Sequence, residues 1–141
     1  TLHMVKPYGF DTSDAAVKKN MKRAGLDYWD KVKIIEYDNL EDFKQKTKGK
    51  KMYLLSTKSK KSHTDIKYED EAYLVFGPET RGLPEDFILE NFENAARIPM
   101  RDIIRSLNLS NAVAIVAYEA QRQLNYKDLL EVSPYFDKKL K

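Results

Sequence analysis

Apolar and polar residues follow one another along the chain in blocks that predict alternating strands and helices. Short continuous apolar runs predict buried strands at residues 2–5, 32–37, 51–56, 72–76 and 95–98. Helical spacing and capping residues predict helices over 13–24, 40–47 and 84–92, the last with Pro84 as its first residue. Residues 57–70 are polar and predict a loop. This order is typical of an α/β fold, with a mainly parallel sheet and helices on both faces.

The strongest helical pattern runs from about residue 108 to residue 124. One apolar stripe is formed by Leu109, Val113, Val116, Ala120 and Leu124. Residues 112–118 are apolar around nearly the whole helix. A chain of 141 residues has the core of one domain and little room for an enclosed helix. We therefore expect this helix to be buried on more than one side, in a homodimer interface.

Composition narrows the possible chemistry. Apolar residues make up 42% and charged residues 33% of the chain, which is typical of a folded globular protein. The absence of cysteine excludes disulfides and thiolate metal sites. No apolar run approaches the roughly 20 residues that span a bilayer. The two histidines lie far apart, so we expect no metal centre, a surface position for His63 and a structural role for His3.

Positive charge gathers in the first half of the chain. Residues 1–63 carry a net charge of +7, and residues 64–141 carry −4. No acid occurs between residues 43 and 64, where the lysines are Lys44, Lys46, Lys48, Lys50, Lys51, Lys58, Lys60 and Lys61. Such a cluster fits a polyanion such as nucleic acid, because each neutralised phosphate releases counterions. A merely solvated, lysine-rich surface is the alternative.

Loops at the carboxyl ends of the predicted strands hold the candidate chemistry, since open parallel sheets bind ligands there. These loops are residues 56–62, 77–82 and 99–107. Within the second, Gly77 and Gly82 either allow the backbone to approach a ligand closely or form an ordinary tight turn. The chain contains no dinucleotide-binding glycine motif, no Walker A sequence and no nucleophile elbow.

Hydroxyl and amide side chains crowd the start of the last helix. They are Ser106, Asn108, Ser110 and Asn111, although a helix cap needs one such residue. One interpretation is capping together with hydrogen bonding of a buried loop. The other is a site that presents neutral polar groups and backbone amides to a polar cofactor.

Three blocks of sequence resemble the SPOUT superfamily of knotted RNA methyltransferases. They are Leu-Leu-Ser-Thr-Lys (54–58), Tyr-Leu-Val-Phe-Gly-Pro-Glu-Thr-Arg-Gly-Leu-Pro (73–84), and the segment 98–120 with Ile-Pro-Met and Ser-Leu-Asn-Leu-Ser-Asn-Ala-Val. Segments 6–10 and 23–28 also resemble one subgroup. In it, small 2′-O-methyltransferases modify the wobble nucleotide, position 34, of tRNA.

The resemblance implies a deep C-terminal trefoil knot that binds S-adenosyl-L-methionine. It places cofactor contacts at Leu55, Gly77, Ile98 and Ser106, with Thr57, Glu79, Met100 and Leu107 as neighbours. Gly77→Val is therefore predicted to abolish cofactor binding by blocking the backbone. The helix 108–124 would form the family's dimer interface. Neither a metal nor a membrane is required, and a cytoplasmic location is implied.

The resemblance makes tRNA the expected partner of the basic residues. Candidate RNA contacts are Lys58, Lys60, Lys61, Arg81, Arg101 and Arg105. Tyr118 either reaches across the dimer toward RNA or packs in the interface. The 2′-hydroxyl as acceptor would distinguish RNA from DNA.

One family motif has no counterpart. Family members begin with a strand and a helix that carry Asn-x-Gly-Asn-Ile-x-Arg, and nothing in residues 1–30 matches it. We therefore expect a single domain that lacks this strand and helix, and we assign no catalytic residue. Open alternatives are a related 2′-O-methyltransferase acting on rRNA or another tRNA position, a non-catalytic RNA-binding module, and a ligand-free structural dimer. The tail 125–141 has no assigned role.

Overall fold

The computed structural model describes residues 1–8, 31–130 and 132. The predicted helix 13–24 and most of the motif segments 6–10 and 23–28 lie outside these residues. The described chain forms two compact units, Thr1–Gly49 and Lys50–Lys141. Within the described part, no helix is long and apolar enough to cross a membrane.

The first unit contains a two-stranded parallel sheet and one helix. Strand β1 (Leu2–Val5) pairs with β2 (Ile34–Tyr37) in register from Leu2↔Ile34 to Val5↔Tyr37. Helix α2 (Leu40–Lys46) begins after Asn39, whose side chain accepts a hydrogen bond from the Asp42 amide at 2.9 Å. Both strands and this helix were predicted from the sequence.

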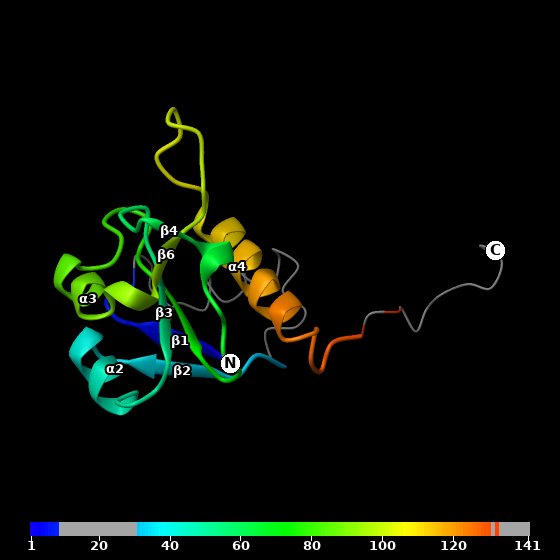
Figure 1. Cartoon of the computed structure of the whole chain (residues 1–141). Coiled ribbons are helices and arrows are strands. Elements are labelled where there is room, and N and C mark those ends of the chain that lie inside the picture. The colour runs from blue at the N-terminus through cyan, green and yellow to red at the C-terminus, as the bar shows by residue number, and fades with distance from the viewer. Residues whose placement is uncertain (9–30, 131, 133–141) are drawn as a thin grey trace, which may run out of the picture. The chain divides into compact units, whose positions relative to one another are not determined.

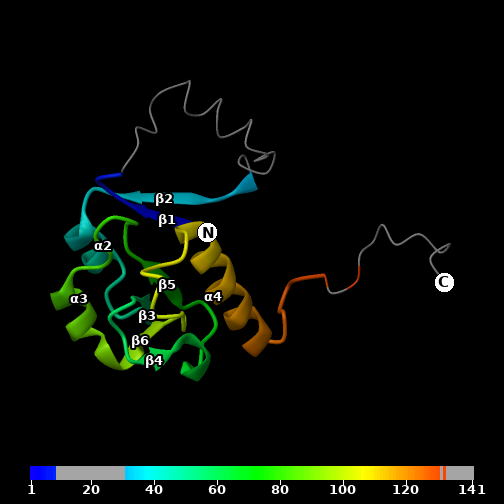
Figure 2. The ribbon, with the colours of Figure 1, turned by 90° about the horizontal axis from the view of Figure 1, so that it is seen from above.

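The second unit is built on a four-stranded parallel sheet in the order β4-β6-β3-β5 (Figure 1). Its strands are β3 (Met52–Leu55), β4 (Lys61–Ser62), β5 (Tyr73–Phe76) and β6 (Ala95–Arg97). The prediction of parallel strands is confirmed, with one parallel sheet in each unit. Helices α3 (Glu85–Glu90) and α4 (Leu109–Gln123) lie on opposite faces of this second sheet (Figure 2).

Two short elements occur within the segment predicted to be a loop. Strand β4 forms because Lys61 and Ser62 pair with Ala96 and Arg97 of β6. The 3₁₀-helix η2 (His63–Asp65) follows it at once. Ser62 caps this turn, and its own amide donates to the Asp65 carboxylate at 3.1 Å. The Ser-x-x-Asp spacing was a local signal for η2, whereas β4 depends on a distant strand.

Helix α3 is shorter than predicted at both ends. Pro84 adopts an extended conformation (φ −55°, ψ 140°) and occupies the position before the helix instead of opening it. The last helical residue is Glu90, because Asn91 leads into the 3₁₀-helix η3 (Phe92–Asn94). Phe87 and Ile88 are the buried residues of α3.

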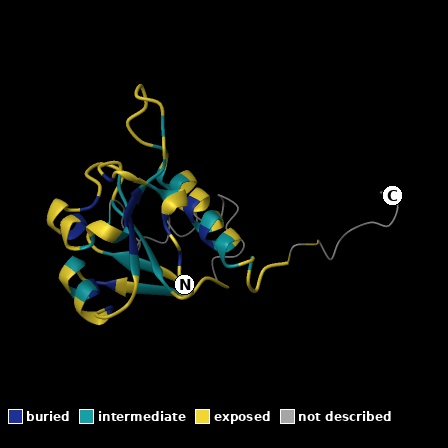
Figure 3. Cartoon of the chain, in the orientation of Figure 1, coloured by how far each residue is buried: buried dark blue, intermediate teal, exposed yellow. Residues whose placement is uncertain are grey.

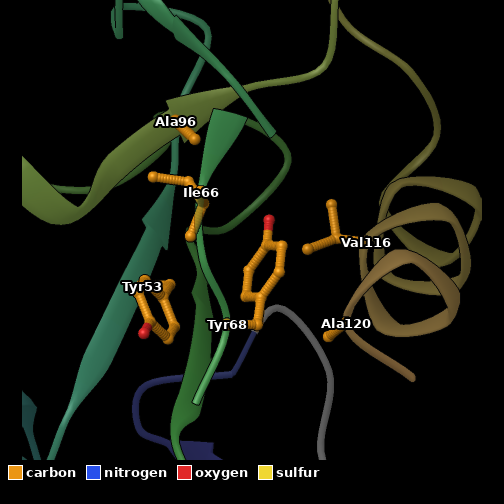
Figure 4. Close-up of a cluster of buried hydrophobic side chains, with 6 residues drawn as sticks. All are labelled: Tyr53, Ile66, Tyr68, Ala96, Val116 and Ala120. Carbon is orange, nitrogen blue, oxygen red and sulfur yellow. The ribbon is translucent and has the colours of Figure 1, made fainter. Parts of the chain in front are cut away.

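The core of the second unit lies between its sheet and α4. Figure 4 shows Tyr53 and Ala96 from the sheet, Ile66 and Tyr68 from the 63–70 segment, and Val116 and Ala120 from α4. Gln123 joins the helix to that segment, because its side chain accepts from the Tyr68 amide (3.0 Å) and donates to the Ile66 carbonyl (2.9 Å). Burial raises the pKa of Tyr68 to about 12.

Helix α4 has one buried face in this single chain, so burial of a second face in a homodimer stays a prediction. Val116 and Ala120 are buried, whereas Val113, which the stripe predicts to be buried, is 38% exposed. Ile115 and Tyr118 are 40% and 65% exposed, and Figure 3 shows this exposed face of the helix.

Candidate functional site

The carboxyl edge of the β6-β3-β5 sheet brings together three of the four predicted cofactor contacts. Leu55, the last residue of β3, lies in register with Phe76 of β5 and Ala96 of β6. Gly77 directly follows Phe76, the last residue of β5, and Ile98 directly follows Arg97, the last residue of β6. Leu55 and Ile98 also pack against the same hydrophobic cluster. The predicted loops therefore leave adjacent strands at one edge, as ligand-binding loops of parallel sheets do.

The loop 77–83 is closed upon itself. The Gly82 amide donates to the Pro78 carbonyl at 2.9 Å, and Gly82 has a φ of +70°. A Cβ on Gly77 would lie 2.2 Å from the Gly82 carbonyl carbon and 2.3 Å from the Leu83 nitrogen. Gly77 is thus required by the loop's own backbone, which favours the tight turn that the sequence left open as an alternative to close approach of a ligand. Gly77→Val would disrupt the loop itself.

The loop after β3 is a tight turn with a buried hydroxyl that the sequence did not single out. The Ser59 amide donates to the Ser56 carbonyl at 3.1 Å, and Ser59 is 4% exposed. Its hydroxyl is buried and has no hydrogen-bond partner among the described residues, as is true of Nε of Arg97 at the end of β6. Arg97 ends β6 at the carboxyl edge, and Ser59 belongs to the loop that leaves β3 at that edge. Unsatisfied buried polar atoms in a native fold commonly mark a ligand or an ordered water.

The fourth predicted contact, Ser106, lies in the segment between β6 and α4, and among the described residues no strand pairing ties it to this edge. Residues 101–106 are exposed and belong to a long loop that rises away from the sheet before α4 begins (Figures 1 and 3). Ile103 in this loop is 80% exposed. Met100 and Leu107, at the two ends of this loop, are half-buried, whereas Thr57 and Glu79 in the other loops are exposed.

Two of the four polar residues at the start of α4 serve as its cap. The Asn108 side-chain oxygen accepts from the Ser110 amide (3.0 Å), from the Asn111 amide (3.4 Å) and from the Ser110 hydroxyl (2.5 Å). Capping therefore accounts for Asn108 and Ser110. It does not use the side chains of Ser106 and Asn111.

Acids distant in sequence neutralise part of the lysine cluster. Lys58 forms an ion pair with Glu85, and Lys61 forms one with Glu93 at 2.9 Å. Lys58 accordingly holds the pKa of Glu85 below its usual value. In the first unit, Lys44 and Lys46 pair with Glu41 and Asp42. The positive character inferred from the sequence between residues 43 and 64 is thus reduced by the fold. The other basic candidates, Lys60, Arg81, Arg101 and Arg105, are all exposed.

The two histidines lie in different units and have different surroundings. His63 is half-buried, with its Nδ1 buried, which corrects the predicted surface position. In the first unit, Nδ1 of His3 lies 2.8 Å from the Tyr37 hydroxyl, consistent with the predicted structural role. Burial lowers the pKa of His3. Among the described residues, no group of three or more His, Asp or Glu side chains is arranged to hold a metal ion.

An open pocket of about 380 Å³ lies at the other edge of the sheet. It is bordered by Lys51 and Tyr53 at the start of β3 and by Glu93 and Asn94 before β6. Its walls carry the Lys51–Glu69 and Lys61–Glu93 ion pairs, so each positive charge on the wall is paired with a negative one. None of the predicted cofactor residues lines this pocket.

Comparison with known proteins identifies the family. A sequence profile described as "SpoU rRNA Methylase family" matches residues 1–118 of this chain. The chain belongs to this family. The prediction drawn from the three motif blocks is therefore confirmed at the family level.

The similar proteins carry names that specify an RNA reaction. A Listeria monocytogenes protein named "Putative tRNA (cytidine(34)-2'-O)-methyltransferase" is 48% identical, covering 99% of this chain and 81% of that protein. A Saccharophagus degradans protein named tRNA (cytidine(34)-2'-O)-methyltransferase is 43% identical, covering 89% of this chain and 79% of its own length.

Solved structures share the fold. A Bacillus anthracis protein described as a "putative RNA methyltransferase" gives a TM-score of 0.80 at 50% identity, covering 93% of this chain and 82% of its own. A structure described as giving insight into "2-OH methylation of C/U34 on tRNA" gives 0.77 at 39% identity, covering 89% and 80%. An AdoMet-bound rRNA methyltransferase from Sinorhizobium meliloti gives 0.65 at 26% identity, covering 86% and 45%.

Proposed function

We propose that this protein transfers a methyl group from S-adenosyl-L-methionine to the ribose 2′-hydroxyl of the wobble nucleotide, position 34, of tRNA. Similarity over nearly the whole chain to proteins named for this reaction carries the proposal. The meeting of Leu55, Gly77 and Ile98 at one sheet edge supports it, because these residues come from the three motif blocks.

S-adenosyl-L-methionine is polar at both ends, and the residues at this edge offer polar groups that could bind it. Backbone groups at Leu55, Gly77 and Ile98 would hold it, with Thr57, Glu79 and Met100 beside them. The buried Ser59 hydroxyl and Arg97 Nε offer hydrogen-bonding groups that the fold leaves unsatisfied. When bound, S-adenosyl-L-methionine supplies the electrophilic methyl group.

Ser106 and Leu107 would join this set if the loop before α4 lay over the sheet edge. The trefoil knot of similar proteins would produce that arrangement, and the proposal includes it. In the knot, the chain would enclose the cofactor and exclude water from it. Orientation of the ribose then supplies much of the rate enhancement, as in other two-reactant transfers. The catalytic base remains unassigned.

The active form is proposed to be a homodimer that packs through α4. Val113, Ile115 and Tyr118 form an apolar face that one chain leaves exposed. Burying such a face stabilises an obligate dimer. Tyr118 packs there or reaches toward RNA.

The two units are proposed to form one methyltransferase domain, because the family profile spans both. Lys60, Arg81 and Arg105 are proposed to contact tRNA in the cytoplasm.

A methyl-transfer assay tests this function. The full-length protein is incubated with radiolabelled S-adenosyl-L-methionine and unmodified tRNA, and the labelled nucleotide is mapped. We expect label on the ribose of nucleotide 34. A matched tRNA with 2′-deoxyribose at that position should take up no label, because the acceptor hydroxyl is missing. Label elsewhere in tRNA would contradict the proposed substrate, as would label in rRNA but not tRNA when total RNA is supplied instead.

A further inference from the structure

Two lysines of the segment 58–61 are bound by acids near the two ends of α3, Glu85 at its start and Glu93 in the following η3. Nζ of Lys58 pairs with the carboxylate of Glu85, the first residue of α3. Nζ of Lys61 donates to the carboxylate of Glu93 at 2.9 Å and to the Glu93 carbonyl oxygen at 2.8 Å. Neither acid is near its lysine in sequence. The fold therefore creates both ion pairs.

These pairs are exposed and can exchange partners. The Lys58 and Lys61 side chains are 55% and 43% exposed, and the Glu85 and Glu93 side chains are 71% and 84% exposed. Exposed ion pairs are weak, because water and salt screen them. An RNA phosphate can therefore take the place of either carboxylate, at the cost of breaking the pair.

Lys61 can bind a phosphate without leaving its position. An ammonium group has three N–H donors, and Lys61 directs two of them to Glu93. If the carboxylate is displaced, the bond to the Glu93 carbonyl still holds the ammonium in place. Among the described residues, the Lys58 ammonium bonds only to the Glu85 carboxylate and gains no such anchor.

We propose that Glu85 and Glu93 are built-in competitors of RNA, which occupy the phosphate-binding lysines Lys58 and Lys61 and so limit the strength of tRNA binding. The inference rests on the proposed function, since it takes tRNA as the polyanion. Weak binding by these lysines favours dissociation of the tRNA. The two acids are thus affinity-setting residues and take no part in the transfer step.

Binding of an unmodified tRNA transcript to the full-length protein tests the inference. Glu85→Gln and Glu93→Gln should each tighten binding about two- to five-fold, which is the range expected for losing one exposed ion pair. The gain should be at least as large for Glu93→Gln, because the Lys61 ammonium stays anchored. The slope of log affinity against log salt should steepen by about 0.7–0.9 for each lysine released.

A matched control separates competition from a general change of charge. Asp86 is the exposed neighbour of Glu85 in α3 and forms no ion pair with the lysines of the described part of the chain. Asp86→Asn changes the net charge by the same amount and should leave affinity nearly unchanged. In a protein that already carries Lys58→Gln, the gain from Glu85→Gln should disappear, because no ammonium group is left for Glu85 and the RNA phosphate to compete for.

Each outcome decides the inference. Gains from the Glu85 and Glu93 variants that need the paired lysine support it. Equal gains from Asp86→Asn, gains that persist with Lys58→Gln, or unchanged affinity would overturn it. The methyl-transfer assay with the parent protein is read separately. Its failure at nucleotide 34 would reject the proposed function, whereas binding unaffected by the acids would reject only this inference.

Discussion

The closed loop 77–83 gives the sharpest stability prediction. A Cβ on Gly77 would lie 2.2 Å from the Gly82 carbonyl carbon, about 1.3 Å short of the roughly 3.5 Å at which two carbon atoms make contact. The obstructing atoms belong to the main chain and cannot rotate away. We therefore expect Gly77→Ala to cost about 3 kcal/mol, the upper end of the usual overpacking range.

Two other glycines serve as matched controls. Gly82 and Gly49 have φ values of +70° and +79°, and a Cβ on either would meet no atom within 4 Å. Alanine at these positions should cost only about 1 kcal/mol, from the left-handed backbone. Thermal denaturation is the assay, and about 4 °C in Tm corresponds to 1 kcal/mol for a domain of this size. Gly77→Ala should thus lower Tm by about 12 °C and the controls by about 4 °C.

The same variants separate folding from cofactor binding. S-adenosylhomocysteine is titrated by calorimetry at a temperature where each variant is folded. We expect Gly77→Ala to lose binding, because its loop no longer closes. A Gly77→Ala protein as stable as Gly82→Ala would refute the steric argument. Normal binding of S-adenosylhomocysteine by the Gly77→Ala protein would contradict the placement of this loop in the proposed site.

Three further predictions concern α4. Val116→Ala should lower the free energy of unfolding, measured by urea denaturation, by about 2 kcal/mol, because a fully buried side chain loses two methyl groups. Val113→Ala should lower it by less than about 0.5 kcal/mol in the monomer and should instead weaken dimerisation, measured by sedimentation equilibrium. The reverse ranking would contradict the observed burial. Asn108→Ala should cost about 1 kcal/mol, measured in the same way, through loss of the helix cap, and no change would show that the cap is unimportant. Hydrogen bonds from Arg122 and Gln123 hold the pKa of Glu119 at about 2, below its usual 4.5. The ionised carboxylate therefore stabilises the fold at neutral pH, and this stabilisation is lost as pH falls from about 5 toward 2. Glu119→Gln should therefore lower Tm at pH 7, with the difference shrinking toward zero at pH 2; a difference independent of pH would argue against the ionised form.

Local patterns in the sequence were sufficient for most of the regular elements. Continuous apolar runs located β3 and β5, whose residues are buried or half-buried. The long apolar pattern located α4 to within one residue at each end. Strand β4 was missed because Lys61 and Ser62 have no strand-like pattern, and their extended conformation depends on pairing with β6.

The candidate site was predictable in its location but not in its details. Strand order in a parallel sheet places Leu55, Gly77 and Ile98 at one edge, so their proximity follows from topology. The contact between Gly77 and the Gly82–Leu83 backbone depends on loop conformation, which sequence spacing does not determine. The partners of Lys58 and Lys61 lie 27 and 32 residues away, so the net charge of a local window could not reveal them.

Gln123 also bears on the order in which the protein is made. Its bonds to Ile66 and Tyr68 join positions 57 and 55 residues apart, and they hold the helix that covers Tyr53 and Ala96. A ribosome adds roughly 5–20 residues per second, so β3 through β6 emerge seconds before α4 is complete. During that interval, the apolar face of the sheet is open to water and to other nascent chains. We expect this nascent intermediate to be the stage at which the protein most needs a chaperone.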